Sequence, residues 1–97
     1  MRRQKTEQVG AVIAQFLREV GLEKPFLEHK VIEAWPRLMG SLVQKYTGKI
    51  EIKDGVLFVQ IKSAALRQEL FIARNQLVKK MNDEVGAQII NEIRLLG

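Results

Sequence analysis

The clearest pattern along the chain is a period of two in the apolar residues on both sides of Asp54-Gly55. An Asp-Gly pair favours a two-residue turn with positive φ, and a period of two predicts β-strands. Residues 49–62 are therefore predicted to form a β-hairpin. The predicted facing pairs are Lys53 with Val56, Ile52 with Leu57, Glu51 with Phe58, Ile50 with Val59 and Lys49 with Gln60.

This register separates two chemically different faces, because side chains alternate across a strand. The predicted core face consists of Ile50, Ile52, Leu57, Val59 and Ile61. The predicted solvent face consists of Lys49, Glu51, Lys53, Val56, Phe58, Gln60 and Lys62. Gly48, just before the hairpin, is expected to mark a β-bulge or a close backbone approach.

Apolar residues at helical spacing predict two helices before the hairpin. The first begins at Thr6 and stops at Gly21, a residue type common at helix C-termini. The second begins near Pro25, and Pro36 is expected to kink or break it at Trp35, with a helical turn continuing to Gly40 or a little past it. A lone tryptophan on such a stripe is more often core than a stacking platform. The predicted apolar positions are Val9, Val12, Ile13, Phe16, Leu17 and Val20, then Leu27, Val31, Ala34 or Trp35, and Leu38.

After the hairpin, Ser63 is placed to N-cap one long amphipathic helix that ends within residues 82–86. Its apolar face is predicted to carry Leu66, Leu70, Ala73, Leu77 and Met81. Residues 88–96 alternate and predict a third strand, at whose start Ile89 and Ile90 compete for the inward position.

The predicted order is therefore α-α-β-β-α-β. This order predicts an α+β fold, a two-layer sandwich with a three-stranded mixed sheet and helices on one face. We expect a flexible basic N-terminus over residues 1–5 and a single domain over residues 6–97.

Composition narrows the range of functions. The chain has 97 residues, a net charge of +5 and no cysteine, which favours an anionic partner and fits a cytoplasmic protein. We expect no membrane span, no export signal and no cofactor. His29 is the only histidine, so a metal site is not expected and His29 is predicted to lie on the surface. No nucleophile or phosphate-binding motif is present, and we expect no enzymatic activity.

The candidate binding site is the solvent face of the hairpin. Phe58 lies there among lysines, a combination suited to stacking a base while the lysines follow phosphates. The alternative is that the N-terminal segment or a second copy of the chain covers this face. The predicted DNA-binding residues are Lys49, Lys53, Phe58 and Lys62, extended by Arg2, Arg3 and Lys5, with Arg67 and Arg74 as the next candidates.

The predicted element order resembles a type II KH-like domain, and a further set of residues resembles a particular family. The set comprises Trp35-Pro36-Arg37-Leu38-Met39-Gly40, Tyr46-Thr47, Asp54-Gly55-Val56-Leu57-Phe58-Val59, Ser63-Ala64-Ala65-Leu66, Glu69-Leu70, Met81-Asn82, Gly86 and Ile93-Arg94-Leu95. In this order they are similar to the DciA family, bacterial proteins that assist loading of the replicative helicase at origins.

The resemblance implies a KH-like domain that binds DNA, especially single-stranded or branched, and contacts the ring helicase without hydrolysing nucleotide. Many family members add a basic extension, for which the short basic N-terminus is expected to substitute here. Two alternatives stay open: an RNA-binding KH-like module, and a protein-interaction adaptor. The G-x-x-G loop with which KH domains clamp nucleic acid is absent, which weighs against the first alternative. The helicase-contact surface and the oligomeric state are left open.

Overall fold

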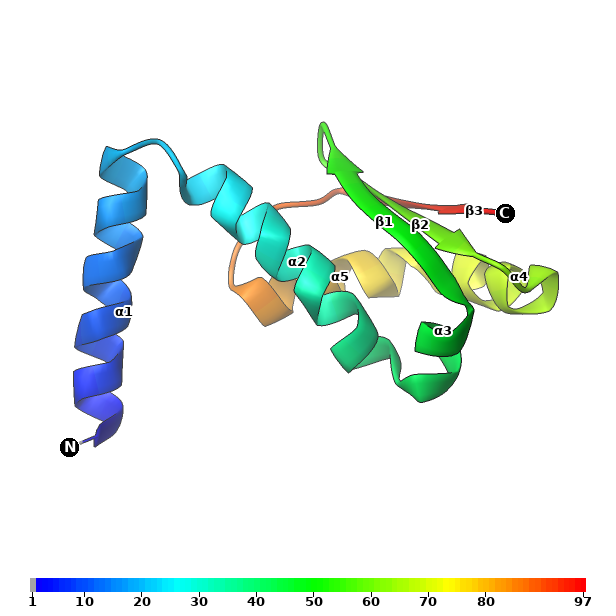
Figure 1. Cartoon of the computed structure of the whole chain (residues 1–97), viewed down its shortest axis with the longest axis horizontal. Helices are drawn as coiled ribbons and strands as arrows, with labels where there is room; N and C mark the ends of the chain where they lie inside the picture. Colours follow the sequence, from blue (N-terminus) through cyan, green and yellow to red (C-terminus); the bar gives the residue numbers. More distant parts are fainter. Residues whose placement is uncertain (1) are drawn as a thin grey trace.

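The hairpin predicted around Asp54-Gly55 lies in the middle of the fold (Figure 1). The computed structural model describes the backbone of residues 2–97 and the side chains of residues 10–97. Within that range there are five helices and three strands, in the predicted α+β order. They are α1 (Arg2–Glu19), α2 (Glu23–Met39), α3 (Ser41–Tyr46), β1 (Thr47–Lys53), β2 (Val56–Ile61), α4 (Ala64–Ile72), α5 (Arg74–Val85) and β3 (Glu92–Leu96).

The sheet has the order β1-β2-β3, with β1 antiparallel and β3 parallel to the central β2. Asp54 has φ of 52° and Gly55 has φ of 77°, the positive angles that a two-residue hairpin turn requires. Four of the five predicted pairs are confirmed, from Lys53 with Val56 to Ile50 with Val59. The mixed sheet follows from the helical crossover that returns the chain to β2 as a parallel neighbour.

The fifth predicted pair, Lys49 with Gln60, does not form as a regular one-to-one pair, because the register shifts between Thr47 and Ile50. Thr47 pairs with Ile61, so Gly48 and Lys49 together lie opposite Gln60 in a β-bulge. The Lys49 backbone N–H donates to Oε1 of the Gln60 side chain at 3.2 Å. A Cβ at Gly48 would overlap that same oxygen, so both features predicted for Gly48, a bulge and a close approach, are confirmed.

The core lies between one face of the sheet and α2, α4 and α5 (Figure 1). Leu57, Val59 and Ile61 are fully buried on the central strand, whereas Ile50 and Ile52 are only half-buried because β1 is an edge strand. The helices contribute buried Val31, Ala34, Trp35, Leu70, Leu77 and Met81 to the same core. The assignment of the core face is therefore confirmed, less completely at β1 than predicted.

Trp35 is fully buried, as predicted. Its indole Nε1–H donates to Oγ1 of Thr47 at 3.2 Å, and that hydroxyl donates to the carbonyl of Val43 at 2.7 Å. The hydrogen bonds join α2, α3 and the start of β1. A buried indole therefore has its polar group satisfied.

Of the kink or break predicted at Trp35, the break does not occur, and the predicted helical continuation to Gly40 is confirmed. Helix α2 continues through Pro36 to Met39, and the chain turns at Gly40, which has φ of 88°. Proline removes a single N–H donor, and the burial of the neighbouring Trp35 and Ala34 holds the helix together across that loss. A separate short helix, α3, then leads into the sheet.

The single long helix predicted after Ser63 is also wrong, since it divides at Ala73 into α4 and α5. Ser63 caps α4 as expected, its hydroxyl accepting from the Leu66 N–H at 3.2 Å. At the break, Nη1 of Arg74 donates to the Phe71 carbonyl at 2.9 Å, so a side chain satisfies a carbonyl near the end of α4. The predicted apolar face is kept on both helices, with Leu66 and Ala73 half-buried.

The third strand is shorter than predicted, because β3 begins at Glu92 rather than near residue 88. Helix α5 ends at Gly86 with φ of 72°, and the buried side chain of Asn82 then holds the next segment out of the sheet. Its Oδ1 accepts from the N–H groups of Ile89 and Ile90 at 3.0 Å each, and its Nδ2 donates to the Ile90 carbonyl at 2.7 Å. Ile90 takes the fully buried position and Ile89 is half-buried.

Helix α1 stands apart from the rest of the fold (Figure 1). It begins at Arg2 rather than at Thr6, since Arg, Gln and Lys are good helix formers and no breaker intervenes. Its described apolar side chains are largely exposed, including Val12, Ile13 and Phe16. The flexibility expected for residues 1–5 stays a prediction.

Candidate nucleic-acid interface

The face of the sheet opposite the helices carries the outward side chains of all three strands. Their identity follows from the pleat and the register. They are Lys49, Glu51 and Lys53 on β1, Val56, Phe58 and Gln60 on β2, and Glu92, Arg94 and Leu96 on β3. A shallow hollow of about 410 Å³ on this open face is lined by Lys49, Glu51, Lys53, Phe58, Gln60, Leu96 and Gly97. The hollow thus combines an aromatic ring with basic residues.

Phe58 is half-buried near the middle of the open face, and the parallel register places Arg94 of β3 beside it. The Arg94 guanidinium carbon lies 5.8 Å from the centre of the Phe58 ring. An aromatic ring and an arginine plane are the two kinds of protein surface on which unpaired bases stack. Phe58 and Arg94 therefore form a two-part platform where the sequence predicted one aromatic residue.

Sequence reasoning missed Arg94 as a candidate for this site. The alternation in β3 did place it on the opposite side from Ile93 and Leu95, which point inward. The sequence did not predict that β3 pairs with β2. A strand contributed by a distant segment carries no local signal for its neighbour or its register.

Two of the basic groups on this face are paired with carboxylates. Nζ of Lys49 lies 2.7 Å from Oε1 of Glu51, and Nε of Arg94 lies 2.8 Å from Oε2 of Glu92. Hydrogen bonding first and charge attraction second raise the pKa of Lys49 above its ordinary value, and the same two causes raise the pKa of Arg94. Both groups therefore carry full positive charge at neutral pH, although each is partly offset by its neighbour.

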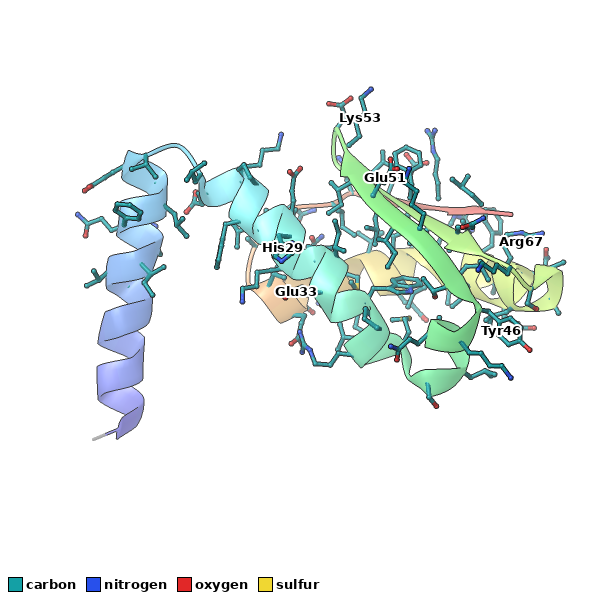
Figure 2. All side chains as sticks on the ribbon, viewed as in Figure 1. His29, Glu33, Tyr46, Glu51, Lys53 and Arg67 are labelled. Atoms are coloured by element: carbon teal, nitrogen blue, oxygen red, sulfur yellow. The ribbon has the colours of Figure 1, made fainter. Side chains whose placement is uncertain are left out.

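Lys53 and Lys62 have no carboxylate within 4 Å among the side chains of residues 10–97. Lys53 lies at the tip of the hairpin (Figure 2), and Lys62 follows the other end of β2. Six residues of extended chain separate Val56, the partner of Lys53, from Lys62, a span of about 20 Å. Phe58 lies between them, so an extended strand that contacts both lysines would cross the ring.

The two helix arginines named as further candidates are not brought onto the open face. Nη1 of Arg67 donates to the carbonyl of Ile61 at 2.6 Å, beyond the end of β2 and near Gly97. Figure 2 shows Arg67 and Lys53 at opposite ends of the sheet. The guanidinium carbon of Arg74 lies 4.0 Å from the centre of the Phe71 ring, in a second hollow along the free edge of β3. Arg94 also lines that hollow and so borders both surfaces.

The side chains of Arg2, Arg3 and Lys5 lie outside the described residues. Their backbone forms the start of α1, at the end of that helix farther from α2 (Figure 1). The structure therefore does not place these residues beside the hairpin.

His29 is exposed, as predicted, with its Nε2 3.6 Å from Oε2 of Glu33 (Figure 2). Across the described part of the chain, no group of histidine, cysteine or acidic residues is arranged to hold a metal ion. Nor does any helix in that part combine the length and apolarity needed to cross a membrane.

The fold and this surface define a class: a small α+β domain, consistent with a KH-like domain, whose mixed sheet is covered by helices on one face and is basic and aromatic on the other. Residues 8–95 match the sequence model of the family described as Dna[CI] antecedent, DciA. The chain belongs to the DciA family.

Curated bacterial relatives carry less specific names. The chain is 29% identical to a UPF0232 protein of Corynebacterium glutamicum, over 94% of this chain and 51% of that protein. A UPF0232 protein of Streptomyces avermitilis is also 29% identical, over 92% of this chain and 50% of that protein. A protein of Mycolicibacterium smegmatis, named for its place in a recF-gyrB intergenic region, is 25% identical over 92% of this chain and 46% of that protein. The chain spans about half the length of these relatives.

Proposed function

We propose that this chain is a DNA-binding accessory domain that assists loading of the replicative DNA helicase when bacterial DNA replication starts. The match to the DciA family over nearly the whole chain carries this proposal. The proposed partners are the ring helicase and single-stranded DNA, and the proposed site of action is the cytoplasm. The domain contributes binding surfaces rather than catalysis.

The DNA is proposed to bind across the open face of the sheet. Lys53 and Lys62 contact phosphates near the two ends of β2, and one or two bases stack on Phe58 and Arg94 between them. Lys49 contributes less at close range, because it must leave Glu51 before it can bind a phosphate. Few phosphate contacts and one stacking site support micromolar affinity with little sequence preference.

A helicase interaction is tested by capture from a bacterial lysate with and without nuclease. The tagged chain should recover the replicative helicase in both conditions. Recovery only without nuclease would mean that nucleic acid bridges the two, and no recovery in either condition would refute the helicase proposal. A Lys53→Gln, Lys62→Gln, Arg94→Gln variant should still capture the helicase if the DNA surface and the helicase surface are separate.

The DNA site is tested by fluorescence anisotropy with a labelled single strand at several salt concentrations. Lys53→Gln with Lys62→Gln should weaken binding for all sequences and flatten the salt dependence. The matched control is Lys24→Gln with Lys80→Gln, which removes the same charge from exposed helix positions and should change both quantities little.

The stacking platform needs a different readout. Phe58→Ala should remove about 1–3 kcal/mol of binding free energy and leave the salt slope unchanged. The open-face site would be refuted by two results together. The Lys53→Gln, Lys62→Gln variant would bind DNA as tightly as the control variant, and Phe58→Ala would have no effect on binding. Tighter binding of an RNA strand of the same sequence would favour an RNA-binding module instead.

A further inference from the structure

The outer edge of β3 is open to a further strand. Among the described residues, the sheet order β1-β2-β3 leaves β3 with one neighbour, and its five consecutive pairs with β2 run without a shift. The other edge strand, β1, carries a bulge at Gly48 and outward lysines, which are devices that discourage pairing with another strand. The outward charges of β3, Glu92 and Arg94, are paired with each other. Of the two edges, β3 is therefore the one suited to accept a strand.

The hairpin turn determines which backbone groups of β3 face outward. The residues that flank a two-residue loop form a hydrogen-bonded pair, so Val56 bonds to β1, and this bonding alternates along β2. Leu57 and Val59 therefore bond to β3, and in a parallel register each bonds to the residues on either side of its partner. Those partners, Ile93 and Leu95, consequently direct their own N–H and C=O groups to the free edge.

The hollow beside this edge combines apolar surface with a fixed cation. It has a volume of about 370 Å³, and Phe71 and Leu96, 51 and 47% exposed, contribute apolar surface to it. The guanidinium of Arg74 stacks on the Phe71 ring and is held by its bond to the Phe71 carbonyl. Arg74 has no carboxylate within 4 Å among the side chains of residues 10–97. The remaining donors of its guanidinium are therefore available to a ligand.

The occupant that matches these features is an extended acidic peptide. A peptide backbone alternates donors and acceptors as the β3 edge does, whereas a nucleic acid backbone presents phosphate oxygens that outward carbonyls repel. A carboxylate on the peptide would bind Arg74 through charge-assisted hydrogen bonds, and a negative peptide complements the net charge of +5. A second copy of the chain fits less well, because edge-to-edge pairing about a two-fold axis brings two such hollows together and supplies neither Arg74 with a carboxylate.

We propose that the free edge of β3 binds an extended acidic peptide segment of a partner protein, which adds a fourth strand to the sheet. The N–H and C=O groups of Ile93 and Leu95 bond to the peptide backbone. On the helix side, one apolar side chain of the peptide packs on Phe71 and one carboxylate binds Arg74. Phe71 and Arg74 lie outside the hollow of the open face, so this site goes beyond the proposed DNA surface.

Fluorescence anisotropy with a synthetic peptide tests the proposal. The probe is a labelled peptide in which threonine and valine alternate and one central valine is replaced by aspartate. It should bind saturably, and asparagine in place of the aspartate should weaken binding about tenfold. N-methylation of one alternate set of its amides should weaken binding about tenfold or more, whereas N-methylation of the other set should change it little, because only one set faces β3.

Two pairs of variants test the protein side. Arg74→Gln should weaken binding of the aspartate peptide about tenfold and abolish its advantage over the asparagine peptide. Lys80→Gln is the matched control, since it removes the same charge from an exposed position of the same helix. Leu95→Pro removes an outward N–H, whereas Leu95→Ala shortens the same side chain and keeps that N–H. Proline should abolish peptide binding and alanine should not, with Trp35 fluorescence checking that both variants are folded.

Several results would overturn the proposal. They are absence of saturable binding by the aspartate peptide, equal losses from the two N-methylated sets, and equal affinities of Arg74→Gln and Lys80→Gln for the peptide. The N-methylated peptides decide the question if Leu95→Pro does not fold. Self-association of the natural chain that Leu95→Ala keeps and Leu95→Pro loses would assign the edge to a second copy instead. Loss of single-stranded DNA binding in Arg74→Gln, without any peptide binding by the natural chain, would assign the hollow to nucleic acid.

Discussion

The side chain of Asn82 offers the sharpest test of how the last strand is positioned. It is the buried polar residue among the described side chains, and it forms three hydrogen bonds to the backbone of Ile89 and Ile90. Replacing it with alanine keeps α5 helical but leaves the N–H and the carbonyl of Ile90 without this partner, whereas the Ile89 N–H still donates to the Ala87 carbonyl at 3.1 Å. The segment that leads into β3, and with it the position of Arg94, depends on these bonds.

The cost can be worked from the contacts. Each buried backbone group left without a partner costs about 1–3 kcal/mol, and both Ile90 groups are buried. The N–H of Ile89 is only partly buried and keeps its bond to the Ala87 carbonyl at 3.1 Å, so losing the Asn82 oxygen costs little there. Alanine returns up to about 0.7 kcal/mol in helix propensity. We expect Asn82→Ala to lower the free energy of unfolding by about 1–6 kcal/mol, against the roughly 5–15 kcal/mol typical of such domains.

Denaturant unfolding followed by Trp35 fluorescence measures this change, and amide hydrogen exchange locates it. The amides of Ile89 and Ile90 should exchange faster in the variant than in the natural chain. The matched control is Asn75→Ala, an exposed position in the same helix, which should change stability by less than about 0.5 kcal/mol. Two results would refute the structural role of the Asn82 hydrogen bonds. One is a loss of unfolding free energy below about 0.5 kcal/mol for Asn82→Ala, and the other is unchanged hydrogen-exchange protection of the Ile89 and Ile90 amides.

Three further predictions follow from the hairpin and the core. Gly48→Ala should lower the free energy of unfolding by about 1 kcal/mol, because the new Cβ displaces the Gln60 side chain from the Lys49 N–H. In a Gln60→Ala background the same substitution should cost nothing, and denaturant unfolding of the single and double variants measures this difference. Leu57→Ala should destabilise by about 2–5 kcal/mol and Glu51→Ala by less than about 0.5 kcal/mol, so equal melting shifts would contradict the face assignment. Trp35 should show blue-shifted emission with little acrylamide quenching, and ready quenching would contradict its burial.

The sequence by itself determined the features that depend on neighbours along the chain. The turn at Asp54-Gly55 needs positive φ, and the period of two on either side then fixes which residues of the hairpin face the core. The cap at Ser63 and the stop at Gly86 are local in the same way. Burial of Trp35 followed from its place on an apolar helical stripe. The basic and aromatic character of the open face could also be predicted from the sequence, because strand alternation alone places Phe58 on the same face as the lysines.

Only the tertiary structure decided the features that depend on segments far apart in sequence. The pairing of β3 with β2 brings Arg94 beside Phe58. The hydrogen bonds from the Asn82 side chain determine that Ile90 rather than Ile89 is fully buried. Packing around Trp35 carries α2 through Pro36, against the local preference of proline. The apolar residues of α1 recur at helical spacing, so the sequence indicates that Phe16 needs a partner surface. It does not identify that surface. Local patterns fix backbone conformation and facing, whereas the choice of contact partners is made by packing between distant segments.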